Sequence, residues 1–139
     1  MKSLGDLGVH IVLVPSAAKF RETWNKSLTP PRLESTDSAR RGGEVSATIM
    51  FHGCVARASG KCNASVRFSL VAPDGRTMPA GEGPLWLEAP QRGRGLLADS
   101  SLTVGFDMND KAGRYNVVAT VIEHESGKQL RVSALFTLL

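Results

Sequence analysis

The sequence contains no apolar run that approaches the ~20 residues a membrane-spanning helix requires, so it offers no candidate transmembrane segment. It has no internal repeat and no low-complexity tract. It has three histidines, His10, His52 and His124, and none of them lies near a G-x-S-x-G pattern or another nucleophile signature. Because no catalytic motif is present, we predict that the chain is not an enzyme and that it holds no cofactor.

The chain also lacks a dense run of basic residues. Its formal net charge is +4, but its cations scatter through turn-like segments and are not interleaved with aromatic residues. Proteins that bind nucleic acids usually gather their cations on one face. We therefore expect no nucleic-acid partner.

A signal peptide is not visible either. The apolar segment nearest the start, residues 9–14, is too short for one and ends at Pro15. The length of 139 residues fits one domain that buries most of its apolar surface in a single core. We expect a single domain, in which residues 1–42 supply a strand, a short helix and a loop, and residues 43–139 form the core.

The first 42 residues contain the one helical pattern. The β-rich segment 9–14 predicts a strand. An apolar stripe at helical spacing follows, formed by Ala17, Phe20, Trp24 and Leu28. Ser16 is a suitable N-cap for this helix, and Pro30-Pro31 ends it.

From Glu44 onward, apolar and polar residues alternate, so each segment has one buried face and one wet face. Turn residues such as Pro73-Asp74-Gly75 separate the segments. The expected strands are residues 9–14, 44–52, 64–70, 85–87, 99–108, 115–122 and 129–138. The stretch 74–98 holds five glycines and three prolines, which argues against a regular ladder through it. The pattern predicts an all-β sandwich of about seven antiparallel strands with one short N-terminal helix.

The cysteine pair, Cys54 and Cys62, lies between two predicted strands and has glycines beside it. The preferred interpretation is a disulfide that staples a hairpin made of residues 44–52 and 64–70, and such a bond indicates an oxidising compartment. A redox dithiol would more often be a C-x-x-C at a helix start. A third interpretation is a zinc or copper site in which His52 joins the two thiols, although no fourth ligand is spaced nearby.

Two patterns resemble known proteins. The segment Asp110-Lys111-Ala112-Gly113-Arg114-Tyr115 resembles the D-x-x-G-x-Y signature of immunoglobulin-like domains, in which the tyrosine bonds back to the chain just upstream. Val117 stands where antibody-type domains have their strand cysteine. More broadly, F-x-G-C, P-D-G, G-x-Y-x-V and a final F-x-L resemble small uncharacterised exported bacterial proteins with an immunoglobulin-like sandwich. The resemblance covers residues 43–138 and implies a fold and a structural corner at Asp110, Gly113 and Tyr115.

Trp86 is the best sequence candidate for a recognition residue. It lies in the Gly- and Pro-rich stretch with Arg92 and Arg94, and aromatic and arginine side chains often anchor interfaces. An equally good interpretation is that Trp86 fills the core. We predict a periplasmic or secreted, non-catalytic module that binds an unidentified protein or small ligand. The alternatives are a small metal-binding protein using His52, Cys54 and Cys62, and an enzyme of unrecognised type.

Overall fold

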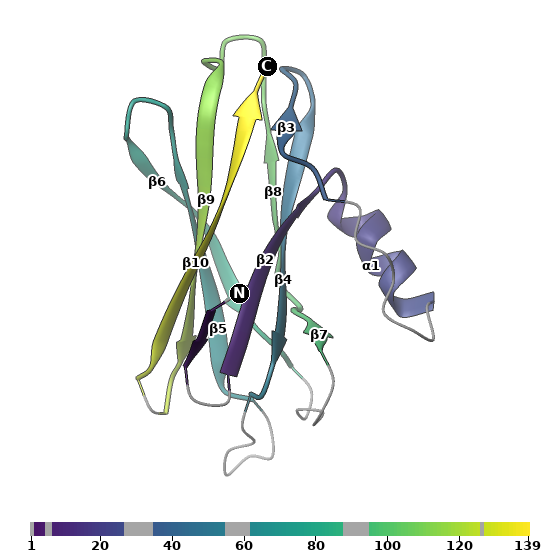
Figure 1. Cartoon of the computed structure of the whole chain (residues 1–139), viewed down its shortest axis with the longest axis vertical. Helices are drawn as coiled ribbons and strands as arrows, with labels where there is room; N and C mark the ends of the chain where they lie inside the picture. Colours follow the sequence, from purple (N-terminus) through teal and green to yellow (C-terminus); the bar gives the residue numbers. More distant parts are fainter. Residues whose placement is uncertain (1, 5–6, 27–34, 55–61, 88–94, 126) are drawn as a thin grey trace.

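The alternating segments form strands in two sheets that pack face to face, and one helix lies outside them (Figure 1). The structure, a computed structural model, describes residues 2–4, 7–26, 35–54, 62–87, 95–125 and 127–139. Its chain is all-β apart from that helix, which confirms the predicted fold class. None of the helices in the described residues is long and apolar enough to cross a membrane.

The first sheet is built around β4 (Glu44–His52), which has partners on both sides. On one side β4 pairs with β2 (Leu7–Val14), and β2 pairs in turn with β1 (Lys2–Leu4). On the other side, β8 (Leu102–Gly105) pairs with the beginning of β4, and β7 (Leu96–Leu97) pairs with its end. All of these pairings are antiparallel.

The second sheet has the order β3-β10-β9-β5-β6. Its strands are β3 (Ser38–Ala39), β10 (Gln129–Leu138), β9 (Gly113–Glu123), β5 (Ala64–Val71) and β6 (Thr77–Pro84). The short β3 runs parallel to β10, and the other neighbours are antiparallel. Because β2 belongs to the first sheet and β3 to the second, the first 42 residues contribute strands to both sheets.

The described residues form ten strands, against about seven predicted, and the additional ones are the short β1, β3 and β7. One predicted strand also lies elsewhere. In the described residues, seven strands have four or more residues: β2, β4, β5, β6, β8, β9 and β10. The strand expected at residues 85–87 is replaced by β6 at residues 77–84, inside the stretch that the sequence predicts to be irregular. The proline- and glycine-rich segment forms a strand because it lies at the edge of the sheet, where half of the backbone N–H groups need no partner. The ladder with β5 shifts register between Phe68 and Ser69.

The predicted hairpin of residues 44–52 and 64–70 is wrong. These segments are β4 and β5, which lie in opposite sheets, so the connection between them crosses the sandwich. Alternation predicts a buried apolar face, but it shows neither which strand lies beside it nor whether the polar face is covered. On β4 the polar face is covered as well, since Ser46 and Thr48, predicted to face water, are buried. The cysteines therefore tie the two ends of a connection between sheets.

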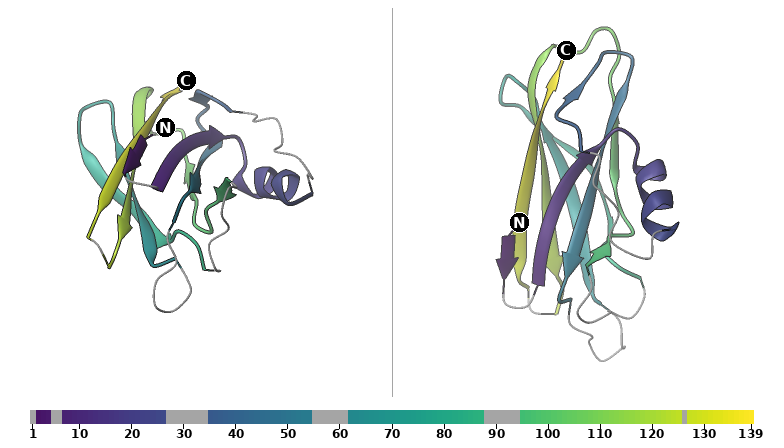
Figure 2. Two further views of the ribbon diagram at one scale, coloured as in Figure 1. Left: turned by 60° about the horizontal axis from the view of Figure 1, so that its bottom comes forward. Right: turned by 45° about the vertical axis from the view of Figure 1, so that its right-hand side comes forward.

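The core fills the space between the sheets. Its largest fully buried side chains include Phe51, Ile49 and Leu85 near one end and Phe136 near the other. The helix α1 (Ala17–Lys26) covers the outer face of the first sheet, where Phe20 packs in a second, smaller buried cluster. In both views of Figure 2, the β5–β6 hairpin projects on the side opposite α1.

Candidate ligand-binding groove

A groove of about 320 Å³ opens between the edge of one sheet and the edge of the other. The strand β8 ends the first sheet on this side, and β6 ends the second. The side chains and backbone that line the groove come from β5, β6, β8, the start of β9 and the two turns beside them: Leu70, Ala72, Pro73, Asp74, Arg76, Met78, Val104, Gly105, Phe106, Asn109, Asp110, Lys111 and Tyr115.

The two edges meet at one end and separate toward the other. At the closed end, the Ser100 hydroxyl donates a hydrogen bond of 2.7 Å to the carbonyl oxygen of Pro84. A Cβ added to Gly83 would lie 2.3 Å from the Ser100 Oγ, so the glycine permits this approach. At the open end lie the turn after β5 and the turn after β8 (Figure 1).

The strand β6 has neither face buried. None of its eight residues is buried, although β6 pairs with β5 along its length. Met78 is paired with Leu70, whose side chain is buried between the sheets, so Met78 lies on the inner face. Its side chain is 36% exposed, which means that the inner face of β6 is open to a ligand.

Charged residues lie at the mouth of the groove. Asp74 accepts a hydrogen bond of 2.9 Å from the backbone N–H of Arg76, and this bond, followed by the charge of the Arg76 guanidinium, lowers the pKa of the Asp74 carboxyl. On the opposite side, Asp110 accepts a hydrogen bond of 2.8 Å from the backbone N–H of Asp107. The groove therefore has an apolar floor and a rim that carries both signs of charge.

Tyr115 forms part of the floor and closes the corner that the D-x-x-G-x-Y pattern predicts. Its hydroxyl donates a hydrogen bond of 2.8 Å to the carbonyl oxygen of Lys111. Gly113 has a φ of 141°, and a Cβ there would lie 3.0 Å from Pro73, so the corner requires glycine. Burial, and then the charge of Asp110, raises the pKa of the Tyr115 phenol.

Replacing Tyr115 with phenylalanine should lower the free energy of unfolding by about 1 kcal/mol, the usual net contribution of a buried hydrogen bond. The ring and its stacking on Phe136, at 5.5 Å between centroids, would remain. Denaturant unfolding measures the change. Lys111→Ala is the matched control, because the bond uses the Lys111 backbone and should survive. Equal midpoints for wild type and Tyr115→Phe would contradict the structural role of the hydroxyl.

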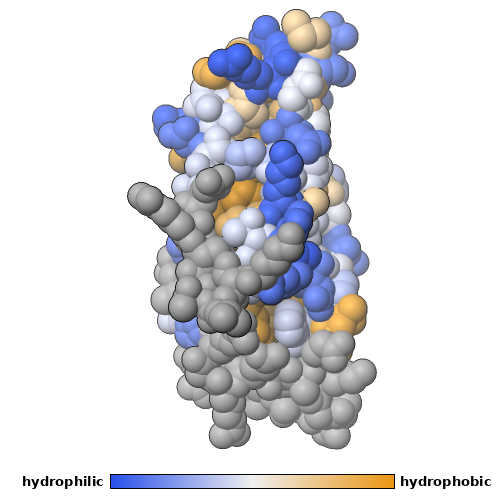
Figure 3. Space-filling model, turned by 90° about the vertical axis from the view of Figure 1, so that its right-hand side faces the viewer, coloured by the Kyte–Doolittle hydropathy of each residue, from blue (hydrophilic) through white to orange (hydrophobic). Residues whose placement is uncertain are grey.

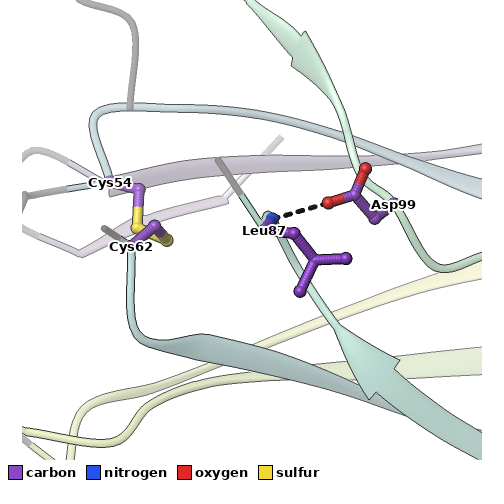
Figure 4. The surroundings of a disulfide bond; sticks show 4 residues. All are labelled: Cys54, Cys62, Leu87 and Asp99. Carbon is purple, nitrogen blue, oxygen red and sulfur yellow. Dashed lines mark hydrogen bonds between the residues drawn. A yellow bond between two sulfur atoms is a disulfide. The ribbon is translucent and has the colours of Figure 1, made fainter. Parts of the chain in front are cut away.

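The cysteines are bonded to each other, which confirms the disulfide (Figure 4). Their Cα atoms are 5.9 Å apart, and both side chains are buried at the end of the sandwich away from the groove. Close to them, the backbone N–H of Leu87 donates a hydrogen bond of 2.6 Å to the Asp99 carboxylate (Figure 4). Because the bond occupies both sulfur atoms, the proposed metal set of His52, Cys54 and Cys62 retains one ligand, the exposed His52.

Trp86 packs against the core. It is half-buried, and its ring meets that of Phe51 edge to face, with 5.8 Å between centroids. This placement favours the core interpretation over the role of an exposed anchor. Arg92 and Arg94, the other two residues of that predicted site, lie outside the described residues.

A serine and a histidine lie in contact on the surface. The Ser65 hydroxyl is 2.9 Å from Nε2 of His124, which is the distance of a nucleophile and its general base. His124 is exposed, whereas such a pair works best in a site that excludes water. The bond joins the beginning of β5 to the end of β9, at the end of these strands away from the groove.

The surface on the α1 side has a different character. Figure 3 shows this face, where hydrophilic residues dominate the upper part and apolar areas are small and separated. A broad apolar patch is typical of a stable protein interface. In the part of this face that the structure describes, no such patch is visible.

Of the residues that line the groove, Asp110 and Tyr115 are predicted from the sequence, as parts of a structural corner. Met78 and Arg76 belong to a segment that the sequence predicts to be irregular, and Asp74 is predicted only as part of a turn signal. One feature of the sequence could have located this edge strand. Pro73-Asp74-Gly75 lies just before a segment with Pro79 and Gly81, which is the composition of an edge strand after a tight turn.

Comparisons with known proteins do not assign the chain to a family. No protein-family model matches the chain, and no curated protein matches it. The chain is similar to a solved structure of a family 123 glycoside hydrolase from Clostridium perfringens, with a TM-score of 0.48 and 15% sequence identity. The similar region covers 96% of this chain and 27% of that chain. The chain thus spans about a quarter of that enzyme, and we draw no conclusion about activity from the similarity.

Proposed function

We propose that this chain is an exported, non-catalytic β-sandwich module that binds a protein or a small ligand, and that the groove between β6 and β8 is its binding site. The observation that carries the proposal is the open inner face of β6, where a hydrogen-bonded strand of the sandwich has no buried residue. Exposed apolar surface in a concave site is stabilised when a ligand covers it.

The composition of the groove supports binding. Leu70, Val104 and Phe106 supply apolar contact area, and the charged residues at the mouth can orient a ligand. The groove lining includes two carboxylates, Asp74 and Asp110, and each accepts a hydrogen bond from a backbone N–H of its own turn. Aspartates commonly stabilise turns in this way, so the lining favours recognition over chemistry.

The disulfide supports export. Disulfides form and persist in the periplasm and outside the cell, and they are rare in a reducing cytosol. The Cys54–Cys62 bond is therefore the feature that supports an oxidising compartment.

A matched pair of variants tests the groove. Ligands are first selected from a fragment library and a library of linear peptides, and their dissociation constants are measured by calorimetry. Met78→Asp should weaken binding by about tenfold or more, because covering a methionine side chain contributes roughly 1.5 to 3 kcal/mol and each 1.4 kcal/mol is tenfold.

The control is Leu135→Asp. Leu135 is also exposed, at 53%, but it lies on β10 away from the groove. This variant should leave the affinity within about twofold, because the ligand does not touch it. Both substitutions are at exposed positions and should leave the fold intact. Equal affinities for the two variants would contradict the groove as the binding site.

A further inference from the structure

We propose that the groove takes an extended polypeptide segment, which pairs with β8 and adds one strand to the first sheet. This inference rests on the proposed function and specifies the class of partner. It follows from three features of the fold: the direction of the backbone groups of β8, the lack of protection at its edge, and the open surface of β6 opposite.

The backbone of β8 has a free side. The N–H of Phe106 donates to Gly43 at 2.9 Å, so at this position the chain faces β4. Backbone groups alternate in direction along a strand, so those of Val104 also face β4, and those of Thr103 and Gly105 point away. Both of these residues are exposed. In the described chain, β8 has β4 as its one strand partner, so these outward groups are available to another strand.

The edge of β8 lacks the features that prevent strand addition. Native edges are commonly blocked by proline, by charged side chains or by bulges. The other wall of the groove has all three: β6 contains Pro79 and Pro84, its Glu82 forms a 3.3 Å ion pair with Arg67, and its ladder shifts register. By contrast, β8 is Leu-Thr-Val-Gly, with neither proline nor charge. Of the two edges that line the groove, β8 is thus the unprotected one.

The surface opposite β8 is shaped for the inner side chains of an added strand. Side chains of a strand point inward at every second residue. In this position they would meet Met78 and Leu70 from the second sheet. Further along β6, Gly81 lies on the same face as the buried Phe68, and a Cβ built on Gly81 would meet nothing within 4 Å. An added strand would complete the packing that β6 lacks.

A single segment fits this place better than a second copy of the chain. The second sheet extends to β6, beyond the edge at β8, and β6 is exposed on both faces. If two copies paired through their β8 strands, the two β6 strands would have to occupy the same space. An isolated extended segment brings no second layer, so it can enter between β6 and β8 as far as the Ser100–Pro84 contact.

The test uses a linear peptide selected from a displayed library against the wild-type protein. Gly105→Pro removes an N–H that points away from β4, and open space around Gly105 leaves room for the ring. It should weaken peptide binding by about tenfold or more, because outward backbone bonds carry strand addition. Gly105→Ala is the comparison, since it adds a methyl group at the same place and keeps the N–H, so it should weaken binding less than Gly105→Pro does. The control is Leu135→Asp, away from the groove, whose affinity should stay within about twofold of wild type.

A second measurement uses the wild-type protein, so it does not depend on the folding of a variant. Single N-methyl groups are placed along the peptide backbone one residue at a time. Strand addition predicts that methylation at alternate residues abolishes binding and that methylation at the residues between has little effect. On binding, the amides of Thr103 and Gly105 should gain protection from hydrogen exchange.

The outcomes separate this inference from the proposed function. If Met78→Asp weakens peptide binding, while Gly105→Pro has no effect and N-methylation shows no alternation, the groove binds through side chains and strand addition is overturned. If none of these changes affects binding, the groove itself is overturned. Selection of fragments without any peptide, or formation of a dimer that Gly105→Pro disrupts, would also overturn the extended segment as occupant.

Discussion

Replacing Trp86 with alanine should lower the free energy of unfolding by about 3 kcal/mol, the low end of the range for removing a large aromatic side chain from a core. Trp86 is half-buried and meets the fully buried Phe51 edge to face, so the truncation removes that contact and leaves a cavity beside the core. Denaturant unfolding measures the change from the shift in midpoint at constant slope.

The neighbouring residue supplies the control. Leu87 is 60% exposed, and Leu87→Ala should change the stability by no more than about 0.5 kcal/mol, as surface substitutions usually do. Trp86→Phe should fall between the two because it keeps an aromatic edge against Phe51. A loss for Trp86→Ala as small as that for Leu87→Ala would show that Trp86 is a surface residue and would restore it as a candidate recognition residue.

Removing the disulfide should lower the free energy of unfolding by about 2 to 3 kcal/mol. The bond closes a loop between residues eight apart, and the chain-entropy model gives a value of this size for so short a loop. The double variant Cys54→Ser with Cys62→Ser tests it by denaturant unfolding. The two-state slope should rise slightly because the unfolded chain becomes less constrained.

The state of the cysteines is checked separately by intact mass. The native protein should weigh about 2 Da less than the reduced protein, because two hydrogens are lost when the bond forms. The control is wild type unfolded in reductant, which should have the stability of the double variant. Free thiols in freshly isolated protein, or equal stabilities of wild type and double variant, would contradict the disulfide and its structural role.

The sequence predicts the layers of the fold well because burial on one face imposes an alternation of apolar residues. The strands β2, β4, β5, β8, β9 and β10 overlap the segments expected from that pattern, and α1 begins directly after its predicted cap, Ser16. The disulfide was predictable because the chain has two cysteines. The Tyr115 corner was predictable because glycine and tyrosine at that spacing serve one local geometry.

What the pattern could not predict is how the strands are arranged beside one another. Alternation in residues 44–52 and 64–70 is the same whether the two segments pair in one hairpin or face each other across a core. The segment of β6 has little alternation because neither face is buried, so the reason that it was missed is also the reason that it lines the groove. The groove depends on where β6 and β8 end their sheets, and no short motif encodes that relation.

The most direct test of the groove is amide NMR of the unmodified protein with a ligand selected as described above. Titration should move the signals of residues that line the groove, above all Met78 on β6 and Gly105 at the end of β8, with a shared saturation curve. The amides near the disulfide and near Trp86, at the other end of the sandwich, should stay in place. Shifts that gather around Trp86 while the groove amides remain unmoved would contradict the assignment of this binding site.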